Sequence, residues 1–344
     1  MRVEPSIPPV PPDQGADRTP EDRGLPRDGV RLLLSTPAAD LHRRFSDLPE
    51  ILRSGDLLVV NESATLPASL PARGKFGEFR VSVSTAYGPG LWVVEPRRGF
   101  GLPGPVPLAP GDHFELGGLP ARYVADFPNI RRLGFVRVEG DLYRAMSEMG
   151  RPVRYGYLSK EYPLSIYQTA FARIPGSAEM PSAGRPFTPR VIEQLEREGV
   201  AFARILLHCG VSSLEPGDAG PLGVPIYPEP FWVPPETAAA IERTRAAGGR
   251  VIAVGTTVVR ALESAVDGCG IRPARGFTRL YLNPERPTRT VDGLLTGFHD
   301  ATSTHLALLA AVAGADRIDR AYRIARAAGY LWHEFGDTQL ILLR

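Results

Sequence analysis

Cysteine is almost absent from this chain of 344 residues. Only Cys209 and Cys269 occur, which is too few for a disulfide framework or for a cysteine-rich zinc site. The six histidines do not have metal-ligand spacing either, because His299 and His305 are six positions apart and no pair is separated by four. We therefore expect no metal in this protein.

The chain also lacks an excess of charge of one sign and any long hydrophobic run. Its 40 lysines and arginines face 38 aspartates and glutamates, and the net charge of +2 argues against strong, diffuse attraction to nucleic acid. No segment has the length and apolarity of a membrane span, and no secretory signal pattern is present. These absences predict a cytoplasmic protein that does not associate with membranes.

The apolar residues that are present suffice for two domains. Hydrophobic residues make up 43% and charged residues 23% of the sequence, and a chain of this length usually forms more than one core. Residues 1–29 differ from the rest, because they contain repeated prolines and few apolar residues. This composition predicts an extended or loosely docked N-terminal arm.

Two kinds of pattern follow the arm. Residues 71–150 contain short alternating runs such as FRVSVS between glycine and proline turns, which predicts a small antiparallel β-barrel or sandwich. Residues 30–70 and 151–344 alternate helical and buried-strand patterns, with Thr188 as the expected N-cap of one helix. The sequence therefore predicts an α/β domain that is built from both ends of the chain and carries the β domain as an insertion.

One strand-to-helix turn has the features of a binding site. Val251 to Val254 read as a short buried strand, and beyond Gly255 the apolar residues recur at helical spacing. Gly255 permits a sharp bend, and Thr256 or Thr257 is expected to cap the helix that follows. Such a turn directs backbone N–H groups and the positive end of the helix dipole toward a carboxylate, a phosphate or a ribose.

The motifs of the chain, taken in order, resemble one known family. They are GDLLVVN, YQTAFA, PSAGRPFTPRVIEQLEREGV, LLHCG, RVIAVGTTVVRALES, VDGLLTGFH with a following ST, and FGDTQLIL. The chain is similar over about residues 30–343 to S-adenosylmethionine:tRNA ribosyltransferase-isomerase, the QueA family of queuosine biosynthesis. The resemblance implies a two-domain fold, an α/β domain with an inserted antiparallel β-barrel.

The resemblance also implies an unusual reaction of S-adenosylmethionine. Enzymes of this family transfer and isomerise the ribosyl part of S-adenosylmethionine onto the aminomethyl amine of a 7-deazaguanine base in tRNA, and they release adenine and methionine. The sulfonium acidifies the neighbouring C5′ hydrogen, so a positioned base can remove that proton and start the expulsion of adenine. Such a site requires a cradle for methionine and ribose, a slot for the purine, and a base with a tuned pKa.

The same resemblance identifies candidate site residues. The residues expected to bind S-adenosylmethionine are Asn61, Tyr167, Gln168, Thr169, Ala183, Gly184, Thr188, Gly255, Thr256, Thr257, Arg260 and Glu263. The candidate acid-base residues are His208, Glu229, Asp337 and, ranked first because it lies in the polar loop FHDATST, His299. The alternative roles are structural: helix capping by the threonines, a surface pair of Arg260 with Glu263, and hydrogen-bonded core histidines.

The chain departs from the family pattern at several polar positions. Pro186 and Tyr227 stand where the family has histidines, and Ala64 stands where it has an arginine. Proline cannot replace histidine as a donor, an acceptor or a base. The departures leave three alternatives: the acceptor is tRNA, the acceptor is a small molecule, or the protein binds S-adenosylmethionine without turnover. We expect a monomer.

Overall fold

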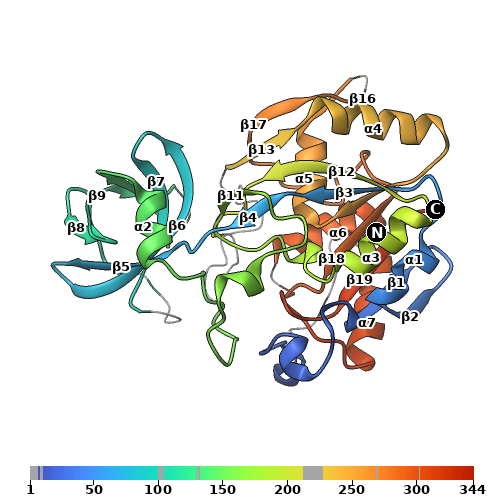
Figure 1. Cartoon of the computed structure of the whole chain (residues 1–344), viewed down its shortest axis with the longest axis horizontal. Helices are drawn as coiled ribbons and strands as arrows, with labels where there is room; N and C mark the ends of the chain where they lie inside the picture. Colours follow the sequence, from blue (N-terminus) through green and yellow to red (C-terminus); the bar gives the residue numbers. More distant parts are fainter. Residues whose placement is uncertain are drawn as a thin grey trace.

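The computed structural model describes residue 7, residues 11–99, residue 104, residues 106–128, residue 130, and residues 132–211, 228–268, 270–301 and 303–344. Within these ranges the chain forms a layered α/β unit and a closed β-barrel, which lie at opposite ends of an elongated molecule (Figure 1). The predicted fold class, α/β with an inserted antiparallel β-barrel, is confirmed. The closed barrel also decides between the two β architectures that the alternating pattern allowed.

A nine-stranded mixed sheet forms the centre of the α/β unit. Strands β12, β3, β14 and β18 run parallel to one another, whereas β13 and β19 flank this group in the antiparallel direction. The strands follow in the order β17 (Ala274–Thr278), β13 (Glu229–Val233), β12 (Ala201–Leu207), β3 (Leu57–Asn61), β14 (Val251–Val254), β18 (Gly293–Gly297), β19 (Thr338–Leu342), β1 (Arg31–Ser35) and β2 (Asp40–Arg44).

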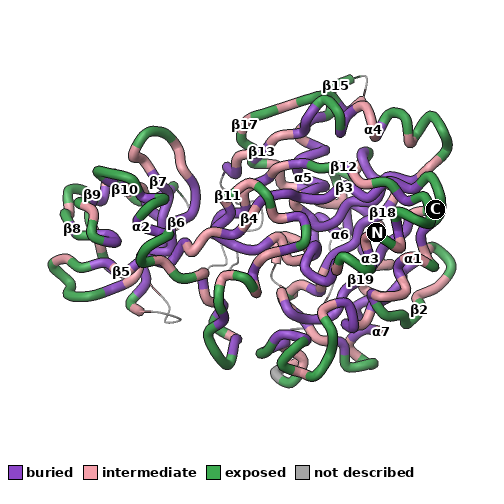
Figure 2. Tube along the Cα trace, in the orientation of Figure 1, coloured by how far each residue is buried: buried purple, intermediate pink, exposed green. Residues whose placement is uncertain are grey.

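Helices cover both faces of this sheet because successive strand side chains point to opposite sides. Leu57 and Val59 of β3 enter one core, and Leu58 and Val60 enter the other. The inner strands β3, β14, β18 and β19 are accordingly buried along almost their whole length, whereas the edge strand β2 is largely exposed (Figure 2). The first core includes α4 (Pro235–Ala246), α5 (Thr256–Ser264), α6 (Thr304–Ala313) and α7 (Ala315–Ala327), and the second includes α1 (Leu48–Ile51) and α3 (Pro189–Arg197).

The barrel has its own apolar core and one helix. Leu142, Ala145 and Met146 of α2 (Leu142–Met149) pack into the barrel interior, and the Asp141 side chain caps this helix by accepting from the backbone N–H of Arg144 at 3.1 Å. All strand pairs of the barrel are antiparallel. Their order is β10 (Gly134–Val138), β7 (Leu91–Arg97), β6 (Gly77–Gly88), β5 (Ser69–Gly74), β8 (His113–Leu116) and β9 (Leu119–Asp126).

The chain enters and leaves the barrel at one place. The backbones of Ser69 and Arg151 exchange two hydrogen bonds, N–H to O=C at 2.8 and 2.9 Å. On the α/β side of this crossing, β4 (Ser63–Thr65) pairs in parallel with β11 (Ile174–Ser177). Two further short strands, β15 (Val266–Asp267) and β16 (Gly270–Ile271), form a separate ribbon. A boundary near residues 70 and 151 remains our proposed division of the chain.

The N-terminal segment is packed more closely than its prolines predicted. Ala16, Thr19 and Asp28 are almost fully buried, and Gln14 accepts a backbone hydrogen bond from the N–H of Trp332 at 2.8 Å. Charged side chains that the proline pattern did not reveal hold the segment in place, among them Glu21. Residues 11–29 are therefore part of the α/β unit and do not form a loosely docked arm.

The helices of the described residues are short relative to a bilayer. None of them is long and apolar enough to cross a membrane.

Candidate active site at the carboxyl edge of the sheet

The ends of several strands bring half of the predicted residues to one edge of the sheet. The parallel strands β12, β3, β14 and β18 all end at this edge, and the antiparallel neighbours β13 and β19 begin there. Open α/β sheets bind ligands at the carboxyl ends of their strands, where the chain switches sides. Here β12 and β14 lie on opposite sides of β3. The edge carries His208, Asn61, Gly255, Thr256, Thr257, His299, Glu229 and Asp337.

The turn between β14 and α5 is built differently from our prediction. Gly255 is the N-cap, with φ 96° and ψ 153°, and no side chain caps the helix. A non-glycine residue is strained at this φ, which explains the glycine. The Thr257 hydroxyl therefore does not cap the helix. Its Oγ1 is buried and has no hydrogen-bond partner among the described residues. An added Cβ on Gly255 would lie 3.4 Å from the Cβ of Ala183, so the predicted Ala183 segment borders this turn.

One turn further along α5, a buried arginine faces the first residue of β13. Arg260 and Glu229 form an ion pair in which neither side chain is more than 7% exposed. Glu229 also accepts from the backbone N–H of Gly210 at 2.8 Å, and Arg260 Nε donates to the carbonyl of Leu280 at 3.3 Å. Arg260 Nη2 is buried and has no partner in the described part of the chain. The ion pair leaves Glu229 poorly suited to act as a base.

Arg260 and Glu263 do not form a surface pair, because both are buried. Glu263 instead accepts hydrogen bonds from the backbone N–H groups of Arg289 and Thr290, at 2.6 and 2.9 Å, and from the Thr290 hydroxyl at 2.9 Å. It fixes the segment that leads into β18, and this explains why a glutamate is buried there.

Three histidines gather beyond the end of β18. The rings of His299 and His305 lie 4.4 Å apart, and His299 Nε2 is 3.0 Å from Thr296 Oγ1. Burial, together with the neighbouring imidazoles His305 and His333, holds the pKa of His299 well below its usual range. Burial and the positive charge of Arg260 lower the pKa of His305 to about 4. These imidazoles are therefore neutral at pH 7.

His208 is held by a chain of hydroxyl groups at the end of β12. Its Nδ1 lies 2.7 Å from Ser63 Oγ, which in turn lies 2.6 Å from Ser177 Oγ. Burial lowers the pKa of His208, so this imidazole is neutral as well. Burial raises the pKa of the neighbouring Cys209 thiol above its usual range, so this thiol stays protonated.

Several predicted residues use their polar atoms within the protein. The Asn61 amide bonds to both backbone groups of Leu207, at 2.8 and 3.1 Å, and the Gln168 amide bonds to both backbone groups of Thr65, at 2.8 and 3.0 Å. Asp337 accepts from Arg31 and from the backbone N–H of Leu331. Because these side chains already have hydrogen-bond partners within the protein, they are better suited to supporting the structure of a site than to binding a ligand or accepting a proton.

The remaining predicted residues are packed or hydrogen-bonded within the protein. Tyr167 is buried, and this burial raises its pKa to about 12. Thr169 Oγ1 accepts from the N–H of Phe171 at 3.2 Å, and an added Cβ on Gly184 would lie 3.4 Å from the Thr169 side chain. Thr188 caps α3, as predicted, and its hydroxyl donates to Asp28 at 2.7 Å.

The sequence did not reveal the residues that come to this region from separate loops and strands. The motifs of the sequence did not point to His305, His333, Ser63 or Ser177. His333 has φ 74°, the one positive φ of a non-glycine residue in the described ranges, and its ring stacks on Tyr157 at 4.3 Å. No spacing rule links these positions, because they come from separate loops. An outlying backbone conformation of this kind is common at functional sites.

The departures from the family pattern have a partial structural explanation. Arg185, next to Pro186, has a side chain only 2% exposed, pairs with Glu21 at 3.0 Å and lies over the ring of Phe335 at 4.8 Å. This segment therefore holds the N-terminal residues in place. Tyr227 lies outside the described residues.

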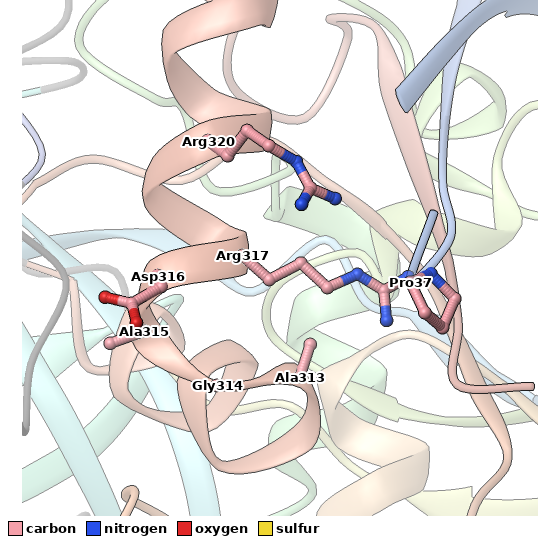
Figure 3. Close-up of a pocket in the computed structure, with 7 residues that line it drawn as sticks. All are labelled: Pro37, Ala313, Gly314, Ala315, Asp316, Arg317 and Arg320. Atoms are coloured by element: carbon pink, nitrogen blue, oxygen red, sulfur yellow. The ribbon is translucent and has the colours of Figure 1, made fainter. Parts of the chain in front are cut away.

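A separate cavity of about 300 Å³ lies at the start of α7, where Arg317 extends toward Pro37 (Figure 3). Arg317 donates to the carbonyls of Ser35 and Leu342, the last residues of β1 and β19. Because those strands end at the edge opposite the site, this cavity does not belong to it. Among the described residues, no group of three or more His, Cys, Asp or Glu side chains is arranged to hold a metal ion.

A carboxyl-edge site with neutral buried imidazoles and unpartnered polar atoms defines the class: an α/β enzyme. The family model described as "Queuosine biosynthesis protein" matches residues 9–341, and the chain belongs to this family.

Named relatives are similar over nearly their whole length. An S-adenosylmethionine:tRNA ribosyltransferase-isomerase of Thermus thermophilus is 40% identical over 97% of both chains, and that of Moorella thermoacetica is 37% identical over 99% of this chain and 100% of its own. The crystal structure of the S-adenosylmethionine tRNA ribosyltransferase of Thermotoga maritima matches with a TM-score of 0.55 and 29% identity, covering 98% of this chain and 99% of that one. The predicted family and the predicted enzyme class, a transferase and isomerase, are confirmed.

Proposed function

We propose that this enzyme transfers the ribosyl-derived unit of S-adenosylmethionine to the aminomethyl amine of a 7-deazaguanine base in tRNA, with release of adenine and methionine. The site lies at the carboxyl edge of the sheet, between the β14–α5 turn and the loop after β18. The full-length similarity to enzymes named for this reaction supports the proposal, and nothing in it favours a small-molecule acceptor or a silent binding protein.

One observation carries the proposal: the buried, unpartnered Thr257 Oγ1 at the start of α5. Buried polar atoms in folded proteins nearly always have partners, so an orphan next to a helix N-terminus points to a ligand. Arg260 Nη2, also buried and unpartnered, is one turn away. These donors suit the carboxylate of the methionine part or a ribose hydroxyl.

The charge of the site fits a sulfonium. His299, His305 and His208 all have lowered pKa values and are neutral at pH 7, so they do not repel a cationic substrate. Glu229 also offsets the charge of Arg260.

We assign the removal of the C5′ proton to His299. Its Nδ1 has no hydrogen bond among the described residues, whereas Nε2 is held by Thr296 Oγ1. When Nε2–H donates to Thr296, the lone pair on Nδ1 is free to accept the proton. Its lowered pKa leaves the free imidazole unprotonated at pH 7 and so able to accept a proton, although it also makes His299 a weaker base than an ordinary histidine.

The test is product release. Purified enzyme is incubated with S-adenosylmethionine, with and without tRNA carrying the aminomethyl base, and adenine and methionine are followed by mass spectrometry. Release that requires the tRNA supports the proposal. Release without tRNA would point to a small-molecule acceptor, and binding without release would point to a silent protein.

A further inference from the structure

The hydroxyl chain at His208 fixes which ring nitrogen carries the proton. Cys209 donates its backbone N–H to Ser177 Oγ at 2.9 Å, and an amide N–H can only donate. Ser177 Oγ has one further hydrogen-bond partner in the described residues, Ser63 Oγ at 2.6 Å. Ser63 Oγ then reaches His208 Nδ1 at 2.7 Å.

One direction of donation satisfies both hydroxyl groups with oxygen and nitrogen acceptors alone. If Ser177 donates to Ser63, then Ser63 donates to Nδ1, and each hydroxyl donates one hydrogen bond and accepts one. If Nδ1–H donated to Ser63 instead, the Ser177 hydrogen would be left with the sulfur of the buried Cys209 thiol, which is only a weak acceptor. Ser63 and Ser177 are at most 1% exposed, so an unmade hydrogen bond there is costly.

The imidazole ring is also fixed sterically. A Cβ added to Gly176 would lie 2.3 to 2.5 Å from Cε1, Nδ1 and Nε2 of His208, so the ring rests directly on the glycine backbone. Gly176 belongs to β11, next to Ser177, and β11 pairs with the strand that contains Ser63. The two-stranded ribbon of β4 and β11 thus fixes both the plane of the His208 ring and the positions of the two hydroxyl groups.

We propose that Ser63 and Ser177 are positioning residues that hold neutral His208 as the Nε2–H tautomer, so that His208 acts as a hydrogen-bond donor to substrate and not as the base. No described residue bonds to Nε2. The acceptor is an oxygen or ring nitrogen of the nucleoside; this part rests on the proposed function, whereas the tautomer does not. Proton removal is then left to His299.

The tautomer is measured directly by ¹⁵N NMR of histidine-labelled protein, with the resonances assigned from His208→Gln. We expect Nδ1 of His208 in the unprotonated range and Nε2 in the protonated range at pH 7. A protonated Nδ1 in the unmodified protein would overturn the proposal.

Variants then test the chain of hydroxyl groups. Ser63→Ala removes the donor to Nδ1, so His208 should become a mixture of both tautomers, and S-adenosylmethionine affinity should fall roughly 3- to 10-fold, the worth of about one hydrogen bond. Ser63→Thr keeps a hydroxyl and should restore both. Ser177→Ala should shift the same resonances, which checks the chain should Ser63→Ala not fold.

The control is Ser35→Ala, which removes an equally buried serine at the opposite edge of the sheet and should change neither the tautomer nor the affinity. An unchanged tautomer in Ser63→Ala would contradict the proposal. If the tautomer behaves as expected but no variant binds S-adenosylmethionine, the proposed function fails while the positioning role stands.

Discussion

Two parts of the carboxyl edge, the start of β19 and the turn between β14 and α5, use polar side chains in opposite ways. At the start of β19, Asp337 accepts from two groups of Arg31 and from the backbone of Leu331. At the start of α5, Thr257 Oγ1 and Arg260 Nη2 are equally buried but have no partners among the described residues. Both sets belong to family motifs, so a shared motif does not by itself distinguish residues that build the site from residues that bind the substrate.

The largest expected effect on stability comes from the buried ion pair of Glu229 with Arg260, next to the unpartnered atoms of α5. Glu229→Ala leaves the Arg260 charge buried without its partner, which should lower the free energy of unfolding by about 3–5 kcal/mol in urea titrations. The control is Glu193→Ala, which breaks an exposed pair with Arg197 and should cost less than about 1 kcal/mol. Equal losses for the two variants would contradict this contrast.

The carboxyl group of Glu334, next to His333 in the sequence, should make the free energy of unfolding depend on pH. Burial raises the pKa of Glu334 from 4.5 to about 7, so below pH 4.5 both states bind its proton, and between the two values only the folded state does. Stability from this group is therefore lost as the pH rises toward 7, by about 3 kcal/mol in total.

Glu334→Gln removes that titration. Relative to the unmodified protein, the variant should gain about 3 kcal/mol between about pH 4.5 and about pH 8, measured as the difference in unfolding free energy at each pH. A difference that is constant with pH would show that Glu334 has an ordinary pKa.

A substitution of Asp337, at the start of β19, should change the stability of the protein but not its affinity for substrate. Asp337→Asn replaces a carboxylate that accepts from Arg31 with a neutral amide, and the expected loss is about 1–3 kcal/mol in unfolding free energy. Calorimetric affinity for S-adenosylmethionine should be unchanged in the folded variant. A weakened affinity would place Asp337 in the binding site after all.

The smallest expected effect is the most direct test of the contrast between partnered and unpartnered polar atoms. Thr257→Val removes only an unpartnered hydroxyl, so unfolding should be unaffected while S-adenosylmethionine affinity falls by about 0.5–1.5 kcal/mol. The matched control is Thr237→Val, whose hydroxyl donates to the Arg204 carbonyl at 2.5 Å and should cost stability but no affinity. Unchanged calorimetric affinity in Thr257→Val would remove the turn from the site.

Local pattern was enough to predict an α/β unit with an inserted β domain, although it left a barrel and a sandwich open for that domain. The alternating runs became barrel strands such as β6, and the Thr188 cap with Pro189 began α3 as expected. The docking of residues 11–29 could not be predicted, because it depends on contacts such as Glu21 with Arg185, which are 164 positions apart.

The site was predictable only as a set of positions. Parallel strands bring their ends together, so the residues after β3, β12 and β14 had to meet. Which of their atoms remain unpartnered depends on long-range hydrogen bonds, such as those of Asn61 with Leu207, which no spacing rule contains. The same limit concealed the proximity of His299 to His305, since a loop must fold back to produce it.

The paired backbones of Ser69 and Arg151 mean that the barrel begins and ends at a single point on its host. Everything beyond that crossing can be exchanged, shortened or lengthened in evolution while the strands of the α/β sheet keep their places. The barrel and the α/β unit can therefore change in sequence and in length independently of each other.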